Sequence, residues 1–135
     1  MIYALTVDGT PRCWKRPKST RHGGLMFNPS APQQAMFRAA CTNEFLRAPL
    51  EGPLKIELLF LFPREHYHFD HDGQILPGAP RFYGRIADVD NLIKFALDAM
   101  IGAIYVDDAQ VMEIKAVKRY ADGMVGRTTV FVETL

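Results

Sequence analysis

The chain has 135 residues, a length typical of one domain with its own hydrophobic core, so we expect a single domain over 1–135. Hydrophobic residues make up 48% and charged residues 23%, which excludes wholesale disorder, and a formal net charge of +1 excludes a polybasic or polyacidic tail protein. Because the sequence has no long apolar run, no signal-peptide pattern and only two cysteines, we expect a cytoplasmic protein with reduced thiols and no membrane contact.

The first predicted element is a strand over residues 2–7, followed by a basic arm at about 10–24. The strand shows alternating side chains, whereas the arm has cations, no acidic residue and several prolines and glycines. Cations can grip phosphates and an indole can stack on a base. The candidate nucleic-acid contacts in the arm are Arg12, Trp14, Lys15, Arg16, Lys18 and Arg21. A solvated loop without a ligand is the alternative.

The remaining regular elements predict an α/β (α+β) fold. A helix is expected near 31–47, then a strand over 54–62 whose two apolar faces predict a central strand covered on both sides. A second helix over 91–101 has apolar residues at i, i+3, i+4 and i+7. Strands at 111–120 and 128–134 flank an Asp-Gly turn and predict a hairpin. We therefore expect a mixed sheet of about five strands packed with two main helices.

A long loop at about 63–87, rich in proline and glycine, separates the second strand from the second helix. Its candidate metal ligands are His66, His68, Asp70, His71 and Asp72. An EF-hand is excluded, because the sixth position counted from Asp70 is not glycine and the twelfth is not glutamate. A zinc site and plain polar surface both remain open. Loops of this length in compact domains are usually functional or mobile.

Acidic residues gather around the second predicted helix: Asp88, Asp90, Asp98, Asp107 and Asp108. Asp90, Lys94 and Asp98 recur at i, i+4 and i+8, which places them on one polar stripe. Crowded carboxylates repel one another unless a hard cation such as Mg²⁺ lies among them, and such an ion can activate water against a phosphate. The alternative is structural, with Asp90 as a helix cap, ion pairs along the stripe and a turn at Asp107-Asp108.

The order and spacing of these residues resemble the signature of a known family. The segment D-V-D-N-L-x-K-x-x-x-D-A-M, with D-D-A-Q-V after a short connection, is similar to the core of the RusA family of Holliday junction resolvases, phage and prophage members included. The match is specific because it holds in order from Asp88 to Val111. Weaker similarity extends to Trp14-Lys15-Arg16-Pro17 and to Glu113 with Lys118-Arg119-Tyr120.

The resemblance implies a crossover junction endodeoxyribonuclease that nicks two opposed strands of branched, four-way DNA in recombination and repair. It places metal ligands on Asp88, Asp90 and Asp108, with Asp107 as a further candidate, and the catalytic lysine on Lys94. It also implies a Mg²⁺ cofactor, with Mn²⁺ as a substitute, and a homodimer. On that basis the carboxylates of the three metal ligands should converge on one point.

The sequence departs from the family pattern in two places. The 63–87 loop looks longer than in compact members, and Arg85-Ile86-Ala87 stand where many relatives carry Lys-Pro, so a phosphate contact is expected on Arg85. Two other functions stay open. A non-catalytic nucleic-acid-binding protein would use the arm alone. A metal-dependent small-molecule phosphohydrolase would leave the arm without a task, and the chain has no Gly-rich phosphate loop.

A homodimer is expected because two symmetric nicks require two metal sites, and a single acidic cluster supplies one. The candidate interface is the apolar segment after the second helix: Ile101, Ile104, Tyr105 and Val106. The alternative is that these residues fill the core of the monomer.

Overall fold

The computed structural model describes residues 1–19 and 23–135 of the chain. Strands, α-helices and two short 3-10 helices follow one another in this order: β1 (Ile2–Asp8), β2 (Lys18–Ser19), β3 (Met26–Phe27), α1 (Ala31–Glu44), β4 (Leu54–Phe62), η1 (His66–His68), α2 (Val89–Met100), η2 (Asp108–Gln110), β5 (Val111–Tyr120) and β6 (Arg127–Thr134). The predicted α+β fold is confirmed, and so are its two main helices, although α1 ends at Glu44 rather than near 47.

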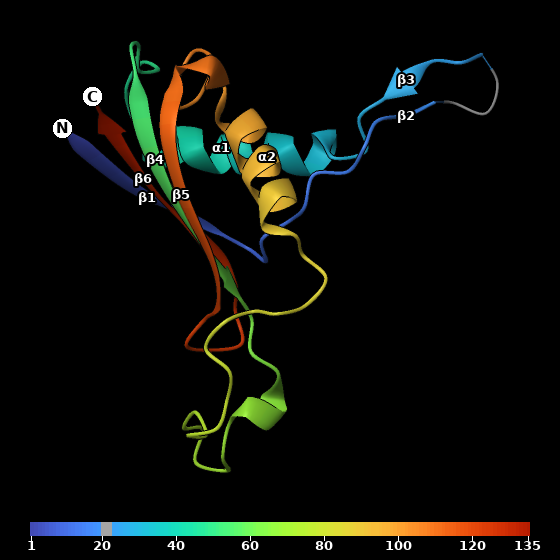
Figure 1. The fold of residues 1–135 in the computed structure, drawn as a ribbon, viewed down its shortest axis with the longest axis vertical. Helices are drawn as coiled ribbons and strands as arrows, with labels where there is room; N and C mark the ends of the chain where they lie inside the picture. The colour runs from blue at the N-terminus through green and yellow to red at the C-terminus, as the bar shows by residue number, and fades with distance from the viewer. Residues whose placement is uncertain (20–22) are drawn as a thin grey trace.

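The main sheet has four strands in the order β1-β6-β4-β5 (Figure 1). β6 is antiparallel to both β1 and β4, whereas β4 and β5 are parallel, so the sheet is mixed. Parallel neighbours need a crossover connection, which residues 63–87 and α2 supply. β2 and β3 form a separate two-stranded ribbon that reaches away from the body of the molecule in Figure 1.

The predicted hairpin of residues 111–120 and 128–134 is wrong, because β5 and β6 lie on opposite sides of β4. Their connection passes over the end of β4, where the Ala121 amide donates to the Phe62 carbonyl at 2.7 Å and the Arg64 amide to the Gly123 carbonyl at 2.9 Å. With β4 between them, both edges of the most apolar strand are hydrogen-bonded, which a β5–β6 hairpin would not achieve.

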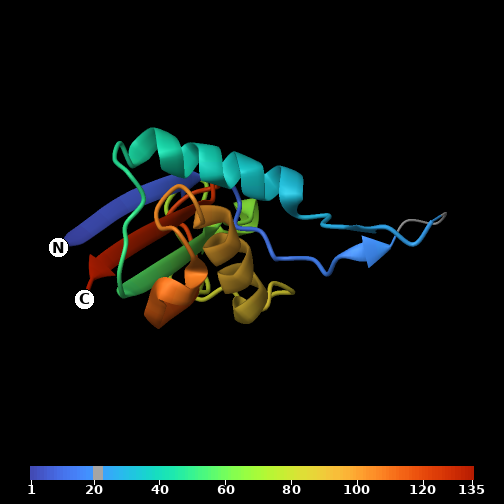
Figure 2. The ribbon, with the colours of Figure 1, turned by 90° about the horizontal axis from the view of Figure 1, so that it is seen from above.

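Both helices cover the same face of the sheet (Figure 2). They meet through Phe37 of α1 and Phe95 of α2, whose ring centroids are 6.0 Å apart in an edge-to-face contact. Leu54 and Ile56 of β4 are fully buried beneath them. The prediction of a central strand is confirmed, because β4 lies between β6 and β5. Cover on both sides is only partial: on the other face Leu61 is buried near the end of the strand, whereas Lys55 is half-buried and pairs with a glutamate.

The segment after α2 belongs mostly to the core. Ile104 and Tyr105 are 0% exposed, and the Tyr105 hydroxyl donates to the Leu97 carbonyl at 2.6 Å. The expectation that these two residues form a dimer interface is therefore wrong, because the monomer core already buries them. Val106, which is 56% exposed, remains available to a partner.

Both cysteines are free. Cys41 lies in the core between α1 and the sheet, where burial raises the pKa of its thiol to about 12. Reduced thiols stay a prediction, with which two unpaired cysteines are consistent.

Candidate metal and DNA site

Two aspartates stand exposed at the N-terminal end of α2. Asp88 occupies the N-cap position with extended backbone (φ −73°, ψ 134°), but its carboxylate accepts no cap hydrogen bond from the described residues. Asp90 lies in the first turn, and its Oδ1 accepts the amide of Asn91 at 3.0 Å. The free amides and macrodipole of this helix end favour negative charge. Asp88 therefore makes no capping contact, Asp90 satisfies one first-turn amide, and both carboxylates keep lone pairs available for a cation.

Lys118, which the sequence analysis did not place in the site, lies beside these acids. Its Nζ donates to the carbonyl of Ala87 at 2.7 Å, immediately before Asp88. Burial raises the pKa of the neighbouring Cys13 thiol, and a hydrogen bond to the Asp88 carbonyl lowers it. The charges of Asp88 and Asp90 also raise this pKa, whereas the charge of Lys118 lowers it. Lys118 therefore brings a positive charge to the N-terminal acids. In the structure, Lys118 pairs in register with Phe60 of β4. The only sign of it in the sequence is a charged residue within a predicted strand.

Lys94 extends from the exposed face of α2 and is held by two neighbours. Its Nζ lies 3.3 Å from Asp98 Oδ2 and 5.0 Å from the centre of the Trp14 ring. Trp14 is half-buried against the core, and its amide donates to the Asn91 carbonyl at 2.9 Å, which docks the start of the arm on α2. The predicted ion pair between Lys94 and Asp98 is therefore present, and the Lys94 ammonium lies over one face of the Trp14 indole. Stacking of Trp14 on a base stays a prediction.

Three further acids gather where α2 ends and η2 begins. Asp107 caps η2, because its Oδ1 accepts the Ala109 amide at 3.0 Å and its own amide donates to Gln110 Oε1 at 2.9 Å. The Ala109 amide lowers the pKa of Asp107. Burial raises the pKa of Asp108, and the neighbouring Asp107 and Asp98 raise it further. Asp107 thus stabilises the turn that begins η2, as the structural alternative predicts. Asp108 and Asp98 place two negative charges close together.

The acids of the site therefore form two groups, at the two ends of α2. Eight residues separate Asp90 from Asp98, and a rise of 1.5 Å per residue puts them ~12 Å apart along the helix axis. Among the described residues, no group of three or more His, Cys, Asp or Glu side chains is placed to hold a metal ion. One chain thus does not bring Asp88, Asp90 and Asp108 to a common point, and their metal binding stays a prediction.

The predicted DNA contacts outside α2 are exposed, and none pairs with a carboxylate of the described chain: Arg12, Lys15, Arg16, Lys18 and Arg85. The base of the arm is fixed, because the Lys15 amide donates to Ser30 Oγ at the start of α1, at 2.9 Å. Arg21 lies outside the described residues. Exposed cations without an acidic partner are free to meet phosphates.

Residues 63–87, which we call the lobe, are built on a buried arginine that the sequence analysis missed. Arg64 is 8% exposed; its Nε donates to the Ala121 carbonyl and its Nη1 to the Pro80 carbonyl, both at 2.8 Å. Its guanidinium also lies over the ring of Tyr120, 5.2 Å from the centroid. The lobe is thereby tied to the end of β5. The sequence offers one signal, an arginine two residues after the end of an apolar strand.

The histidines of the lobe do not form a metal centre in the described structure. His68 is buried, and its Nδ1 lies 3.5 Å from Arg64 Nη1, whereas His66 and His71 are exposed. Asp70 Oδ1 accepts two amides of the following turn at 2.9 Å. Asp70 and His68 therefore have structural partners within the lobe, and a role of these side chains in metal binding stays a prediction.

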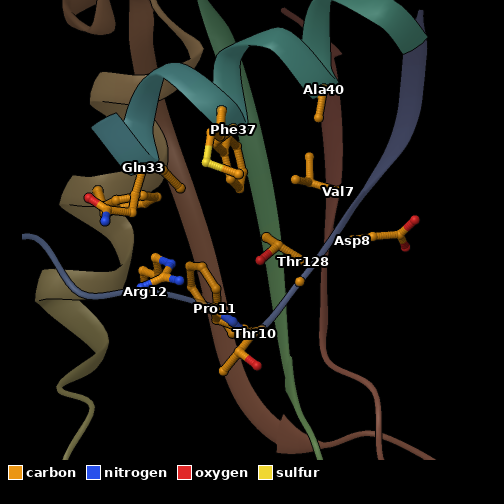
Figure 3. A pocket seen from close by; sticks show the side chains of 14 residues that line it. Val7, Asp8, Thr10, Pro11, Arg12, Gln33, Phe37, Ala40 and Thr128 are labelled. Atoms are coloured by element: carbon orange, nitrogen blue, oxygen red, sulfur yellow. The ribbon is translucent and has the colours of Figure 1, made fainter. Parts of the chain in front are cut away.

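A cavity of about 370 Å³ opens where β1 runs into the arm, beside α1 (Figure 3). Its wall is mainly apolar, with Val7, Phe37 and Ala40 pointing into it, and Arg12 and Gln33 stand at its edge. The acids at the two ends of α2 do not line it. This mainly apolar cavity is therefore separate from the acidic groups.

Comparison with known proteins agrees with the features described above. The family model of endodeoxyribonuclease RusA matches residues 8–133, which include the arm, the lobe and both acidic groups. No curated protein matches the chain. Within the part of the chain that the structure describes, no helix is long and apolar enough to cross a membrane. Since the match covers nearly the whole chain, the resemblance is confirmed: the chain belongs to the RusA family of endodeoxyribonucleases.

Proposed function

We propose that this chain is a cytoplasmic crossover junction endodeoxyribonuclease that uses Mg²⁺ or Mn²⁺ to resolve four-way DNA by paired symmetric nicks in recombination and repair. One observation carries the proposal within the family. Asp88 and Asp90 are exposed at a helix N-terminus, where Asp88 accepts no cap hydrogen bond and Asp90 accepts a single amide, while the cations around them have few acidic partners. This arrangement suits a phosphate that approaches together with a divalent cation.

The donor set of the site fits a hard divalent cation, because the candidate ligands are all carboxylates. Asp88, Asp90 and Asp108 would hold the ion, with Asp107 as a further candidate. A bound Mg²⁺ or Mn²⁺ supplies an activated water and neutralises charge on the scissile phosphate. Burial raises the pKa of Asp108, and the nearby Asp107 and Asp98 raise it further; a bound cation would relieve the repulsion among these carboxylates.

Two lysines of the chain would act on the phosphate itself. Lys94 can leave Asp98 at little cost, since this exposed ion pair contributes less than about 1 kcal/mol. Its ammonium would then neutralise charge that develops on the phosphate oxygens. Lys118 would hold the neighbouring phosphate or orient the backbone before Asp88. The arm would bind the flanking duplex through phosphates, which position the DNA without reading its sequence.

The central test offers the purified protein a labelled four-way junction, a Y-fork, a duplex and a mononucleotide, with and without Mg²⁺. We expect nicks at symmetric positions of the junction, only when the metal is present. Tight binding without nicks would favour the non-catalytic binder. Hydrolysis of the nucleotide alone would favour the small-molecule phosphohydrolase, and either result would overturn the proposal.

A homodimer is part of the proposal, for a reason beyond the need for two nicks. In one chain the acids stand at opposite ends of α2. A C2 pairing that sets α2 antiparallel to its copy would bring Asp88 and Asp90 of one chain towards Asp108 of the other. Each metal site would then draw ligands from both chains.

Complementation between two inactive variants tests this sharing of ligands. Asp90→Asn and Asp108→Asn chains should each fail to nick the junction. A mixed dimer has both substitutions in one shared site and neither in the other, so random exchange should restore about a quarter of the wild-type nicking. No recovery after exchange would refute shared sites, and a strict monomer by light scattering would refute the dimer.

A further inference from the structure

The lobe carries a second open pocket, of about 540 Å³, on the side of β5. Its walls combine three aromatic rings, apolar side chains and one cation: Tyr67, His68, Tyr120, Leu76, Pro80 and Arg85. None of the acids at the ends of α2 lines it. This volume is ample for one planar heterocycle, and the pocket has not been used in the function proposed above.

The pocket is held in shape by hydrogen bonds from beneath. Arg64 fixes the carbonyl of Pro80 on one wall, and the Leu76 amide donates to the His68 carbonyl at 2.9 Å on another. The ring of His68 meets Tyr67 and Tyr120 edge-on, each with centroids 4.8 Å apart. The walls are therefore set before any ligand arrives, which lowers the entropic cost of binding.

The exposed rim of the pocket offers a stacking surface next to a positive charge. Tyr67 is 56% exposed, and its hydroxyl accepts a hydrogen bond from Arg85 Nη2 at 3.0 Å. Arg85 is itself exposed and makes no ion pair with a described carboxylate. The guanidinium is thus oriented by a neutral partner and keeps its charge for an anion. An aromatic face beside an oriented arginine is the pairing that recognises a nucleobase with its phosphate.

The pocket lies close to the N-terminal acids along the chain. Three residues lead from Arg85 to Asp88, so their Cα atoms are at most ~11 Å apart. A nucleotide in the pocket would therefore belong to the DNA segment that passes the acids. With a single cation at its rim, the pocket is better suited to the one phosphate of a nucleotide within a strand than to a free di- or triphosphate.

We propose that the lobe pocket takes one unpaired nucleobase of the DNA strand beside the acidic groups, with its phosphate on Arg85. The proposal rests on the function proposed above, because it deepens how the DNA is held. Unstacking a base costs a few kcal/mol in paired DNA and least where pairing is already interrupted. The lobe would thereby favour branched or distorted DNA over continuous duplex.

The test measures affinity without divalent metal for a junction and for a duplex with one extrahelical nucleotide. Tyr67→Leu should weaken binding to both roughly 5- to 100-fold, as expected for one lost base–aromatic stack. Phe131→Leu removes an aromatic ring that is 39% exposed on the sheet, away from the pocket, and should change neither affinity. Thermal unfolding should show all variants folded, since both replaced rings are exposed.

An abasic nucleotide separates stacking from a general loss of affinity. Placed at the extrahelical position, it should leave wild type and Tyr67→Leu with equal affinity. A deficit for Tyr67→Leu that persists on abasic DNA, or a loss equal to that of Phe131→Leu, would overturn the pocket. A Tyr67-dependent affinity for free mononucleotide that matches the affinity for DNA would also overturn it. Junctions that are bound through Tyr67 but never nicked would overturn the proposed function and leave the pocket standing.

Discussion

The buried arginine of the lobe offers the sharpest test of the architecture. Arg64→Met keeps a long apolar stem and removes the guanidinium, so two carbonyls with 2.8 Å hydrogen bonds lose their donor. A hydrogen bond to a charged group contributes about 1.5–3 kcal/mol. The cation–π contact with Tyr120 adds about 0.5–1 kcal/mol. Removing the buried guanidinium also removes the cost of taking its charge out of water, which offsets part of this loss. We therefore expect a net decrease of about 3 kcal/mol in the free energy of unfolding.

Urea unfolding and amide hydrogen exchange together check that magnitude and its location. A loss of about 3 kcal/mol should lower the melting temperature by roughly 10 °C in a domain of this size. The amides of Leu76 and Tyr120, which donate within the lobe and to it, should exchange faster before the main sheet opens. The control Arg16→Met changes an exposed arginine and should cost less than about 0.5 kcal/mol. A loss below about 1 kcal/mol for Arg64→Met, or unchanged exchange in the lobe, would refute the reasoning.

Three further predictions concern the site and its frame. Asp90→Asn should abolish nicking and leave junction affinity equal or tighter, because less negative charge faces the phosphates; Asp122→Asn, far along the chain from both acidic groups, should nick normally. Full nicking by the first variant in Mg²⁺ would contradict the assignment. Neutralising the arm should lower the slope of log affinity against log salt by about 0.9 per lost phosphate contact, and an unchanged slope would exclude the arm from the interface. The three arm residues to replace by alanine are Arg12, Lys15 and Arg16. Gly126→Ala should destabilise the fold by about 1–3 kcal/mol, because the new Cβ would lie 2.9 Å from the Leu61 carbonyl oxygen. Gly123→Ala meets no atom within 4 Å and serves as its control; equal melting temperatures would contradict this reasoning.

Elements with a strong local pattern could be predicted from the sequence. β4 begins and ends where the alternation of apolar residues does, and α2 carries the helical stripe of its buried face. The pairing of β5 could not be predicted in this way. An Asp-Gly turn between two strand patterns favours a local hairpin. In the folded chain, however, β5 and β6 each pair with an edge of β4 and not with each other.

The fold of the lobe could not be predicted from the sequence, because its main interactions join residues that are far apart in the chain. Arg64 is a single charged residue after a strand, and one of its carbonyl partners lies 57 residues away. Composition alone therefore suggested a polar loop rich in histidine. The structure makes one of those histidines part of a buried arrangement and leaves the others on the surface. A buried cation with distant backbone partners has no periodic signature, so only the folded chain could reveal it.

The spacing of the acidic residues on α2 determines both the face they share and their separation along the helix. Spacings of four and eight residues put side chains on one face of a helix, which is why Asp90, Lys94 and Asp98 suggested one site. The same spacing also fixes their separation along the axis, at ~12 Å for the outer pair, which no single ion with ligands at ~2.1 Å can bridge. Because Asp108 lies with Asp98, one chain divides the candidate ligands between the two ends of α2. In the proposed homodimer, two such helices set antiparallel would bring each group towards the complementary group of the other chain, so the proposed metal sites would require a second copy of the chain.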